Sequence, residues 1–176
     1  MQNNSSDKII ISDAACIIGL TNIGRLDLLK KLFDEVIITP EVKSEYKLSL
    51  PEWIIIMSSK NRALVDEYIG NGFGKGESSS IALAAEITNS ALVLDDDRAR
   101  KFARSKGFNV IGTLTILAGA YDKGYIESYE VVCEDLKKAN FRFTQKIQDD
   151  ALNSISADNK KMSPEKQTPK KKGFRR

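Results

Sequence analysis

Acidic side chains follow several short apolar runs in this sequence, and these are the residues best suited to carry chemistry. They are Asp13 after KIIIS, Glu41 and Glu45 after VIIT, and Asp95, Asp96 and Asp97 after ALVL. Carboxylates that converge on one pocket repel one another, so they need protons or a cation to neutralise them. An all-oxygen ligand set suits Mg²⁺ or Mn²⁺, which can activate a water molecule for attack on a phosphodiester.

Each of these acids also has an ordinary structural explanation. Asp13 and Asp96 could cap helices, which contributes about 0.5–2 kcal/mol each. Glu77, at the start of another predicted helix, would interact favourably with the helix dipole by about 0.3–1 kcal/mol, and Glu45 could be a solvated helix residue. The interpretation as a metal site therefore depends on the joint placement of the acids.

Composition excludes several other chemistries. The 176 residues contain no histidine, which argues against His-based nuclease, protease and zinc sites. Cys16 and Cys133 lie far apart among apolar neighbours, so we expect buried thiols and no disulfide. The segment GNGFGKGES lacks the spacing of a phosphate-binding P-loop. We expect it to be a loop that places Glu77 at a helix start, with Lys75 available to face a phosphate.

Strand and helix patterns alternate along the chain and must position these acids. Strands are expected at 8–12, 36–39, 53–57, 91–94 and 108–112, and helices at 14–33, 40–49, 58–69, 77–89, 95–107, 113–125, 126–139 and 144–154. Such alternation predicts an α/β fold with a mainly parallel sheet covered on both faces. Ligands bind beyond the carboxyl ends of the strands in such sheets, and the acids collect at that edge.

Charge divides the chain into two unlike parts. Residues 160–176 carry eight Lys or Arg against Glu165, whereas the whole chain has a net charge of +3. We therefore predict one domain over 1–155 and a basic C-terminal tail over 156–176 that cannot fold by itself. The tail could attract nucleic acid phosphates, or it could be a solubilising or partner-binding end. No segment has the pattern of a membrane helix or a cleaved signal peptide, so we expect a cytoplasmic protein.

Five stretches, in the expected order over residues 9–152, resemble the PIN-domain superfamily, and most closely its prokaryotic members encoded beside a small antitoxin. They are IISDAACIIGLTNIGRLDLLKKLF, VIITPEVKSEY, GKGESSSIALAAE, LVLDDDRARKFARSKGFNVIGTLTILAGAYDKGYI and LKKANFRFTQKIQDDAL. The resemblance implies a three-layer α/β/α fold. It also implies a quartet of acids that hold Mg²⁺ or Mn²⁺ for cleavage of single-stranded RNA.

The resemblance assigns this quartet to Asp13, Glu45, Glu77 and Asp96, with Glu41 as a competitor of Glu45 and Asp95 as a further metal ligand beside Asp96. The familiar toxin members usually carry Asp where this chain has Glu77, whose side chain is longer by one methylene. Arg100 and Thr113 also match the family pattern. The residues expected to contact nucleic acid or to support the ligands are Lys75, Arg98, Arg100 and Thr113.

The resulting prediction is a metal-dependent endoribonuclease, the toxin of a toxin–antitoxin pair. Its partners would be single-stranded RNA and a small antitoxin that inserts a basic side chain among the carboxylates. The resemblance is compatible with a homodimer formed through helices, which the sequence leaves open. The alternatives are a PIN-like module that binds RNA or a protein without catalysis, and a metal-dependent phosphatase or DNA nuclease.

Overall fold

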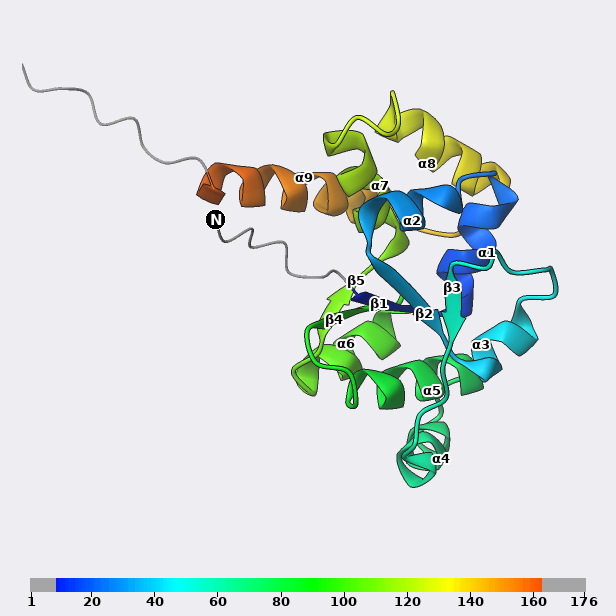
Figure 1. Ribbon diagram of the computed structural model, residues 1–176. Helices are drawn as coiled ribbons and strands as arrows, with labels where there is room; N and C mark the ends of the chain where they lie inside the picture. The colour runs from blue at the N-terminus through cyan, green and yellow to red at the C-terminus, as the bar shows by residue number, and fades with distance from the viewer. Residues whose placement is uncertain (1–8, 163–176) are drawn as a thin grey trace, which may run out of the picture.

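A single parallel sheet forms the centre of the molecule in the computed structural model, which describes the backbone of residues 9–162 and the side chains of residues 9–155 (Figure 1). The strands are β1 (Ile9–Ser12), β2 (Glu35–Ile38), β3 (Ile54–Ile56), β4 (Ser90–Val93) and β5 (Asn109–Ile111). Their order across the sheet is β3-β2-β1-β4-β5, and every neighbouring pair is parallel. The predicted fold class is confirmed.

Helices cover both faces of the sheet. They are α1 (Ala14–Asn22), α2 (Asp27–Leu32), α3 (Pro40–Glu45), α4 (Arg62–Gly70), α5 (Lys75–Ala84), α6 (Asp97–Ser105), α7 (Thr113–Asp122), α8 (Tyr129–Lys138) and α9 (Gln145–Met162). Buried residues of α1, α2, α3, α7, α8 and α9 form one core cluster, and those of α4, α5 and α6 form the other. Because neighbouring strand residues point to opposite faces, Ile10 joins the first cluster and Ile11 joins the second.

The helix expected over 14–33 is interrupted in the structure. Gly24 has a positive φ of 66°, and the Arg25 N–H bonds to the Leu20 carbonyl, so α1 ends at Asn22 and α2 begins at Asp27. Glycine adopts this left-handed conformation without steric cost, which explains why the helical pattern of apolar residues does not carry through it.

The boundaries of the other helices also differ from the prediction by a few residues or more, and three of these differences affect the site or the domain end. Helix α3 ends at Glu45, before the expected residue 49, and α5 begins at Lys75, before the expected residue 77. Helix α9 continues to Met162, past the predicted domain end at residue 155. No proline or glycine interrupts the chain between residue 145 and Pro164, so nothing local stops the helix earlier. The rest of the predicted tail, residues 163–176, lies outside the described residues.

The two cysteines lie in the described part of the chain. Cys16 and Cys133 are both buried free thiols, as predicted. Burial raises the pKa of the Cys133 thiol to about 11, which makes it a packing residue at neutral pH. Within the described residues, no helix is both long enough and apolar enough to cross a membrane.

Candidate functional site

The carboxyl ends of β1, β4 and β5 bring Asp13, Asp95 and Thr113 together. The Asp13 N–H donates to the Val93 carbonyl at 3.2 Å, and the Leu94 N–H donates to the Ile111 carbonyl at 3.0 Å. The three strands are therefore still paired where they end. The polar residues that follow them meet at the sheet edge where parallel α/β folds bind their ligands.

Asp13 is a buried carboxylate that caps helix α1. It is 5 % exposed, and its Oδ1 accepts a hydrogen bond from the Cys16 N–H at 3.1 Å. Burial raises the pKa of Asp13 well above its usual value, and the charges of Asp95 and Glu77 raise it further. The N–H groups of Cys16 and Asp95 oppose this rise. A positive charge placed beside Asp13 would therefore favour its ionised form.

Asp95 is held in place by Thr113. The Thr113 N–H donates to Asp95 Oδ1 at 2.9 Å, and the Thr113 hydroxyl donates to Asp95 Oδ2 at 2.6 Å. Burial raises the pKa of Asp95, while the two hydrogen bonds and the nearby Arg100 guanidinium lower it, and the net shift is upward. Thr113 thus contacts a carboxylate directly, and orienting Asp95 is its visible role.

The structure distinguishes among the three consecutive acids after β4. The exposed Asp96 caps α6, accepting a hydrogen bond from the Ala99 N–H at 2.8 Å. Asp97 is exposed and pairs with Lys101 at 2.6 Å. Of the three, Asp95 is the one whose charge raises the pKa of Asp13. The geometry therefore favours Asp95 as the partner of Asp13, and the assignment of Asp96 to the acidic quartet stays a prediction.

Glu45 and Glu77 approach the site from α3 and α5, with Gly76 between them. A Cβ atom on Gly76 would lie 2.8 Å from Glu45 Oε1, so only glycine lets the Glu45 carboxylate lie this close to α5. Glu77 Oε2 accepts a hydrogen bond from the Gly74 N–H at 3.0 Å, and the Glu77 charge raises the pKa of Asp13. Glu77 therefore lies near Asp13, although it also caps its own helix, and Glu45 lies against the first turn of α5 beside it.

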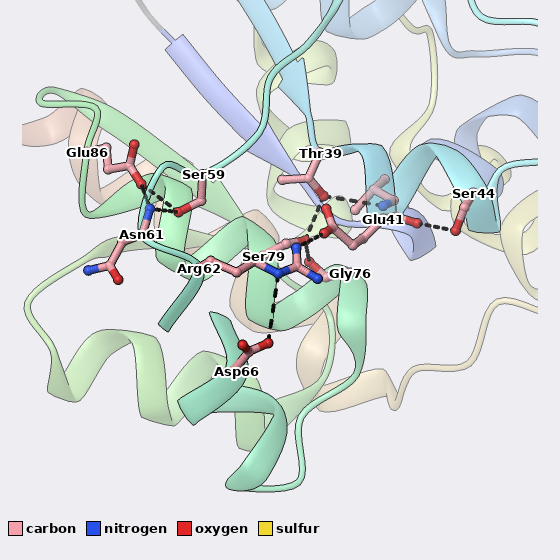
Figure 2. A network of polar contacts seen from close by, with 11 residues as sticks. Thr39, Glu41, Ser44, Ser59, Asn61, Arg62, Asp66, Gly76, Ser79 and Glu86 are labelled. Atoms are coloured by element: carbon pink, nitrogen blue, oxygen red, sulfur yellow. Dashed lines mark hydrogen bonds and ion pairs between the residues drawn. The ribbon is translucent and has the colours of Figure 1, made fainter. Parts of the chain in front are cut away.

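Glu41, the competitor of Glu45, belongs to a separate polar network. Its Oε1 lies 2.8 Å from Arg62 Nη1, and Figure 2 shows Arg62 between Glu41 and Asp66. Burial tends to raise the pKa of Glu41, but hydrogen bonds from its own backbone, Arg62 and Ser79 outweigh burial and lower it. Glu41 therefore links α3 to α4 and α5.

The same network holds the first turn of α5. Thr39 Oγ1 lies 2.7 Å from Ser79 Oγ, and the Ser79 hydroxyl donates to the Gly76 carbonyl at 3.0 Å (Figure 2). Thr39 and Ser79 are both buried. Because Gly76 precedes Glu77 directly, these contacts fix the backbone from which Glu77 projects.

The basic residues expected near nucleic acid have unequal surroundings. Arg98 donates to the Asn71 and Gly72 carbonyls and lies 4.7 Å from the centroid of the Phe73 ring, so it ties α6 to the loop before α5. Lys75 is exposed at the first position of α5. Arg100 faces Asp95, and its buried Nε has no hydrogen-bond partner in the described structure.

The donor set has the chemistry of a site for a hard divalent cation. Two mutually repelling carboxylates with raised pKa values, Asp13 and Asp95, lie next to Glu77, and all of their donor atoms are oxygen. Within the described residues, however, no group of three or more acids, cysteines or histidines is arranged closely enough to hold a metal ion. The structure thus provides an electrostatic reason for a cation but not a complete ligand cage.

A parallel α/β/α module with acids at the carboxyl edge of its sheet is compatible with a nuclease-type domain. A family model described as a PIN domain matches residues 9–157, and the chain belongs to this family. No curated protein and no solved structure matches the chain. PIN domains are generally nucleases and typically use divalent metal ions, so the chain is a nuclease-type module.

Reasoning from sequence did not find every residue around this site. Arg104 and Arg142 line a cavity next to Asp95, as do Phe141 and Phe143. The run ANFRFT contains Phe141, Arg142 and Phe143, and its alternation of aromatic and basic residues is typical of nucleic acid binding. No local signal pointed to Arg104, which lies on the α6 helix among other basic residues.

Proposed function

We propose that this protein is a metal-dependent endoribonuclease that cleaves single-stranded RNA, with Mg²⁺ or Mn²⁺ as its cofactor. The observation that carries the proposal is the pair formed by the buried Asp13 and the half-buried Asp95 at the ends of β1 and β4, whose pKa values are both raised and whose charges repel each other. Such a pair costs folding free energy unless a cation compensates it. Membership of the PIN family supports phosphodiester hydrolysis as the reaction.

In this proposal Asp13, Asp95 and Glu77 hold the metal, and Glu45 orients the water nucleophile from α3. A bound divalent ion would lower the pKa of a water molecule and neutralise the charge that develops on the phosphate. Thr113 orients Asp95 through its two hydrogen bonds, and Cys16 supplies the backbone N–H that orients Asp13. Arg100 lies beside Asp95, whose pKa its charge lowers, and would interact with a phosphate bound there.

The proposal includes a role as the toxin of a toxin–antitoxin pair. An inhibitory partner would be a small protein that places a basic side chain beside Asp13 and Asp95. The same electrostatics that favour a metal ion support this mode of inhibition, because a guanidinium or ammonium group would also relieve the repulsion between these carboxylates. Co-expression with a small protein encoded directly upstream should then restore growth that the nuclease alone slows.

The experiment that tests the activity is cleavage of a mixed pool of single-stranded RNA by purified protein with Mg²⁺ or Mn²⁺. We expect Asp13→Asn and Asp95→Asn each to abolish cleavage, because each removes a charge from the carboxylate pair. Asp27→Asn is the matched control, since Asp27 is exposed on α2, pairs with Lys31 at 2.6 Å and does not line the cavity beside Asp95. Asp96→Asn should retain activity, because asparagine can still cap α6.

A second function, binding of RNA without cleavage, is supported by one observation. The Glu77 carboxylate is bonded to the Gly74 N–H, and no described triad of acids is close enough to hold a metal. If the wild-type protein does not cleave RNA, and the wild type and both aspartate variants bind RNA equally, the nuclease proposal is wrong and a binding module is the better account.

A further inference from the structure

A cavity of about 580 Å³ opens directly beside Asp95. Its walls come from α6, from the turn between β5 and α7, and from the segment 141–154 that contains the first turns of α9. We call this cavity the α6–α9 groove and define it by Asp95, Arg100, Arg104, Phe141, Arg142 and Phe143. Because Asp95 belongs to both, the groove is continuous with the carboxylate site.

The charges of the groove are only partly balanced. Asp97 and Asp150 also line it, but they pair with Lys101 and Lys146, each at 2.6 Å. Among the described residues of the groove, Arg104 and Arg142 have no carboxylate partner within ion-pair distance. Unpaired guanidinium groups leave the groove with a surplus of positive charge suited to an anion.

Arg100 and Arg104 contribute to this positive charge from helix α6. Arg104 Nη2 donates to the Val110 carbonyl at 3.2 Å, which fixes the guanidinium at the groove wall and leaves its other N–H groups available. The Arg100 Nε atom is buried and has no hydrogen-bond partner in the described structure. Buried donors are rarely left unsatisfied, so this atom is a second indication that a ligand with acceptor oxygens belongs here.

The outer end of the groove adds aromatic surface. Phe141 and Phe143 are both partly buried, and their ring centroids lie 6.3 Å apart. Arg142 stands between them in the chain and is exposed. Guanidinium groups combined with aromatic rings in one groove are the combination that binds single-stranded nucleic acid, because cations hold the phosphates and bases stack on the rings.

We propose that the α6–α9 groove binds the stretch of single-stranded RNA next to the phosphate that lies at Asp95, with Arg104 and Arg142 as phosphate contacts. The inference rests on the proposed function for the position of the reacting phosphate. Charge and aromatic content favour RNA over a protein partner as the occupant. The strand thus runs from the carboxylates past the β5–α7 turn toward the start of α9.

The test is RNA affinity measured by fluorescence anisotropy in EDTA, with the full chain and a short fluorescein-labelled oligouridylate. Arg142→Gln should weaken binding about threefold or more at low salt. It should also make the negative slope of log K against log salt shallower by about 0.7, which is the contribution of one phosphate contact on a single strand. Arg25→Gln is the matched control, because Arg25 is exposed on the turn between α1 and α2 and does not line the groove. It should leave the slope unchanged.

A second variant tests the aromatic surface separately. Phe143→Leu keeps an apolar side chain but removes the ring, so affinity should fall while the salt slope stays the same. Equal effects of Arg142→Gln and Arg25→Gln, or no effect of either, would overturn the proposal. So would an absence of RNA binding by the wild type, in which case a protein is the better candidate for the groove.

The outcomes separate this proposal from the nuclease proposal. If wild-type protein cleaves RNA with Mg²⁺ or Mn²⁺ but Arg142→Gln binds as tightly as wild type, the groove assignment fails and the nuclease stands. If Arg142→Gln alone weakens binding but wild-type protein does not cleave, the groove assignment stands and the nuclease fails. Thermal unfolding of each variant confirms that the fold is retained.

Discussion

Thr113 is uncharged, but it orients one of the acids of the candidate site. Its N–H and hydroxyl both bind the Asp95 carboxylate, so one residue at the start of α7 fixes an acid at the end of β4. Thr113 is fully buried, whereas the Asp95 carboxylate that it holds is half-buried at the edge of the cavity. The position of Asp95 relative to Asp13 therefore depends on a neutral residue.

This dependence predicts a difference between two small substitutions. Thr113→Val keeps the shape of the side chain but leaves Asp95 Oδ2 without its hydroxyl donor, so the free energy of unfolding should fall by about 1–3 kcal/mol. Thr113→Ser keeps the donor and should cost clearly less. Urea denaturation at neutral pH measures both, and equal losses for the two variants would show that the hydroxyl does not stabilise the site.

The sequence predicts the kind of chemistry that the site can carry better than it predicts which individual residues form the site. Asp13 follows a clear strand, so its place at the sheet edge could be predicted. The choice between Asp95 and Asp96 could not, because both follow the same strand and one residue decides which carboxylate faces β1 and which caps α6. Only the backbone path out of β4 distinguishes them.

Among the elements, α1 packs closely against the segment before α9, next to the groove. A Cβ atom on Gly19 of α1 would lie 2.7 Å and 2.9 Å from two ring carbons of Phe141. Phe141 is also a groove residue. The absence of a side chain at Gly19 thus lets α1 support the groove wall.

Two helical glycines with opposite surroundings test this packing. Gly19→Ala should destabilise the protein by about 1–3 kcal/mol, because the Phe141 ring must move out of a packed position. Gly119→Ala, in α7, meets no atom within 4 Å of the added Cβ and should stabilise by about 0.5–1 kcal/mol through helix propensity. Chemical denaturation of both variants gives the comparison, and two changes of the same sign would contradict it.

The connection between β3 and α4 depends on the Glu86 carboxylate, which follows α5. It accepts hydrogen bonds from the Ser59 hydroxyl and from the Lys60 and Asn61 N–H groups. The Ser59 bond is the largest cause of a lowered Glu86 pKa, and the two N–H groups add to it. One exposed carboxylate therefore orders a loop that leads into α4.

The lowered pKa predicts how stability depends on pH. An acid whose pKa is lower in the folded state stabilises the fold above its unfolded pKa, near 4.5 for a glutamate, and loses this contribution as pH falls through the folded pKa. Glu86→Gln should therefore lower the free energy of unfolding at neutral pH by a modest amount. The stability of this variant should also decrease less than that of the wild type as the pH is lowered. Thermal melts between pH 3 and about 7 measure this, with exposed Glu52→Gln as the control; identical profiles for the two variants would refute the role of Glu86.

Element order could be predicted from the alternating patterns, whereas several element boundaries could not. The helical spacing of apolar residues continues across Gly24 from residue 14 to residue 33, yet the positive φ of Gly24 divides this segment into α1 and α2. The strand pattern cannot reveal the sheet order, because β1 pairs with β2 and β4 through crossovers distant in sequence. Local periodicity reports which face of an element is buried, but not which partner buries it.

The whole molecule separates negative from positive charge along its sequence. Residues 1–162 have a net charge of −2, whereas residues 163–176 carry six Lys or Arg and one Glu. An RNA strand therefore gains no long-range attraction from the net charge of residues 1–162, and the groove arginines attract it only locally. The basic C-terminal segment would supply the long-range attraction that the domain lacks.

A chain ending at Met162 tests this division. It should keep the thermal midpoint of the full protein, because the two core clusters are built from residues up to 155. Its RNA affinity should fall and the slope of log K against log salt should become shallower, since up to six phosphate contacts are removed. A full-length variant with the six Lys and Arg of residues 163–176 changed to Gln separates charge from length.

The groove and the basic segment should contribute independently if they contact different phosphates. Arg142→Gln should then lower the salt slope by the same amount in the truncated chain as in the full chain, because distant contacts contribute additively. A slope that truncation leaves unchanged would show that the segment does not bind RNA, and its alternative roles in solubility or partner binding would then apply. An effect of Arg142→Gln that disappears on truncation would show instead that groove and segment hold the same stretch of RNA.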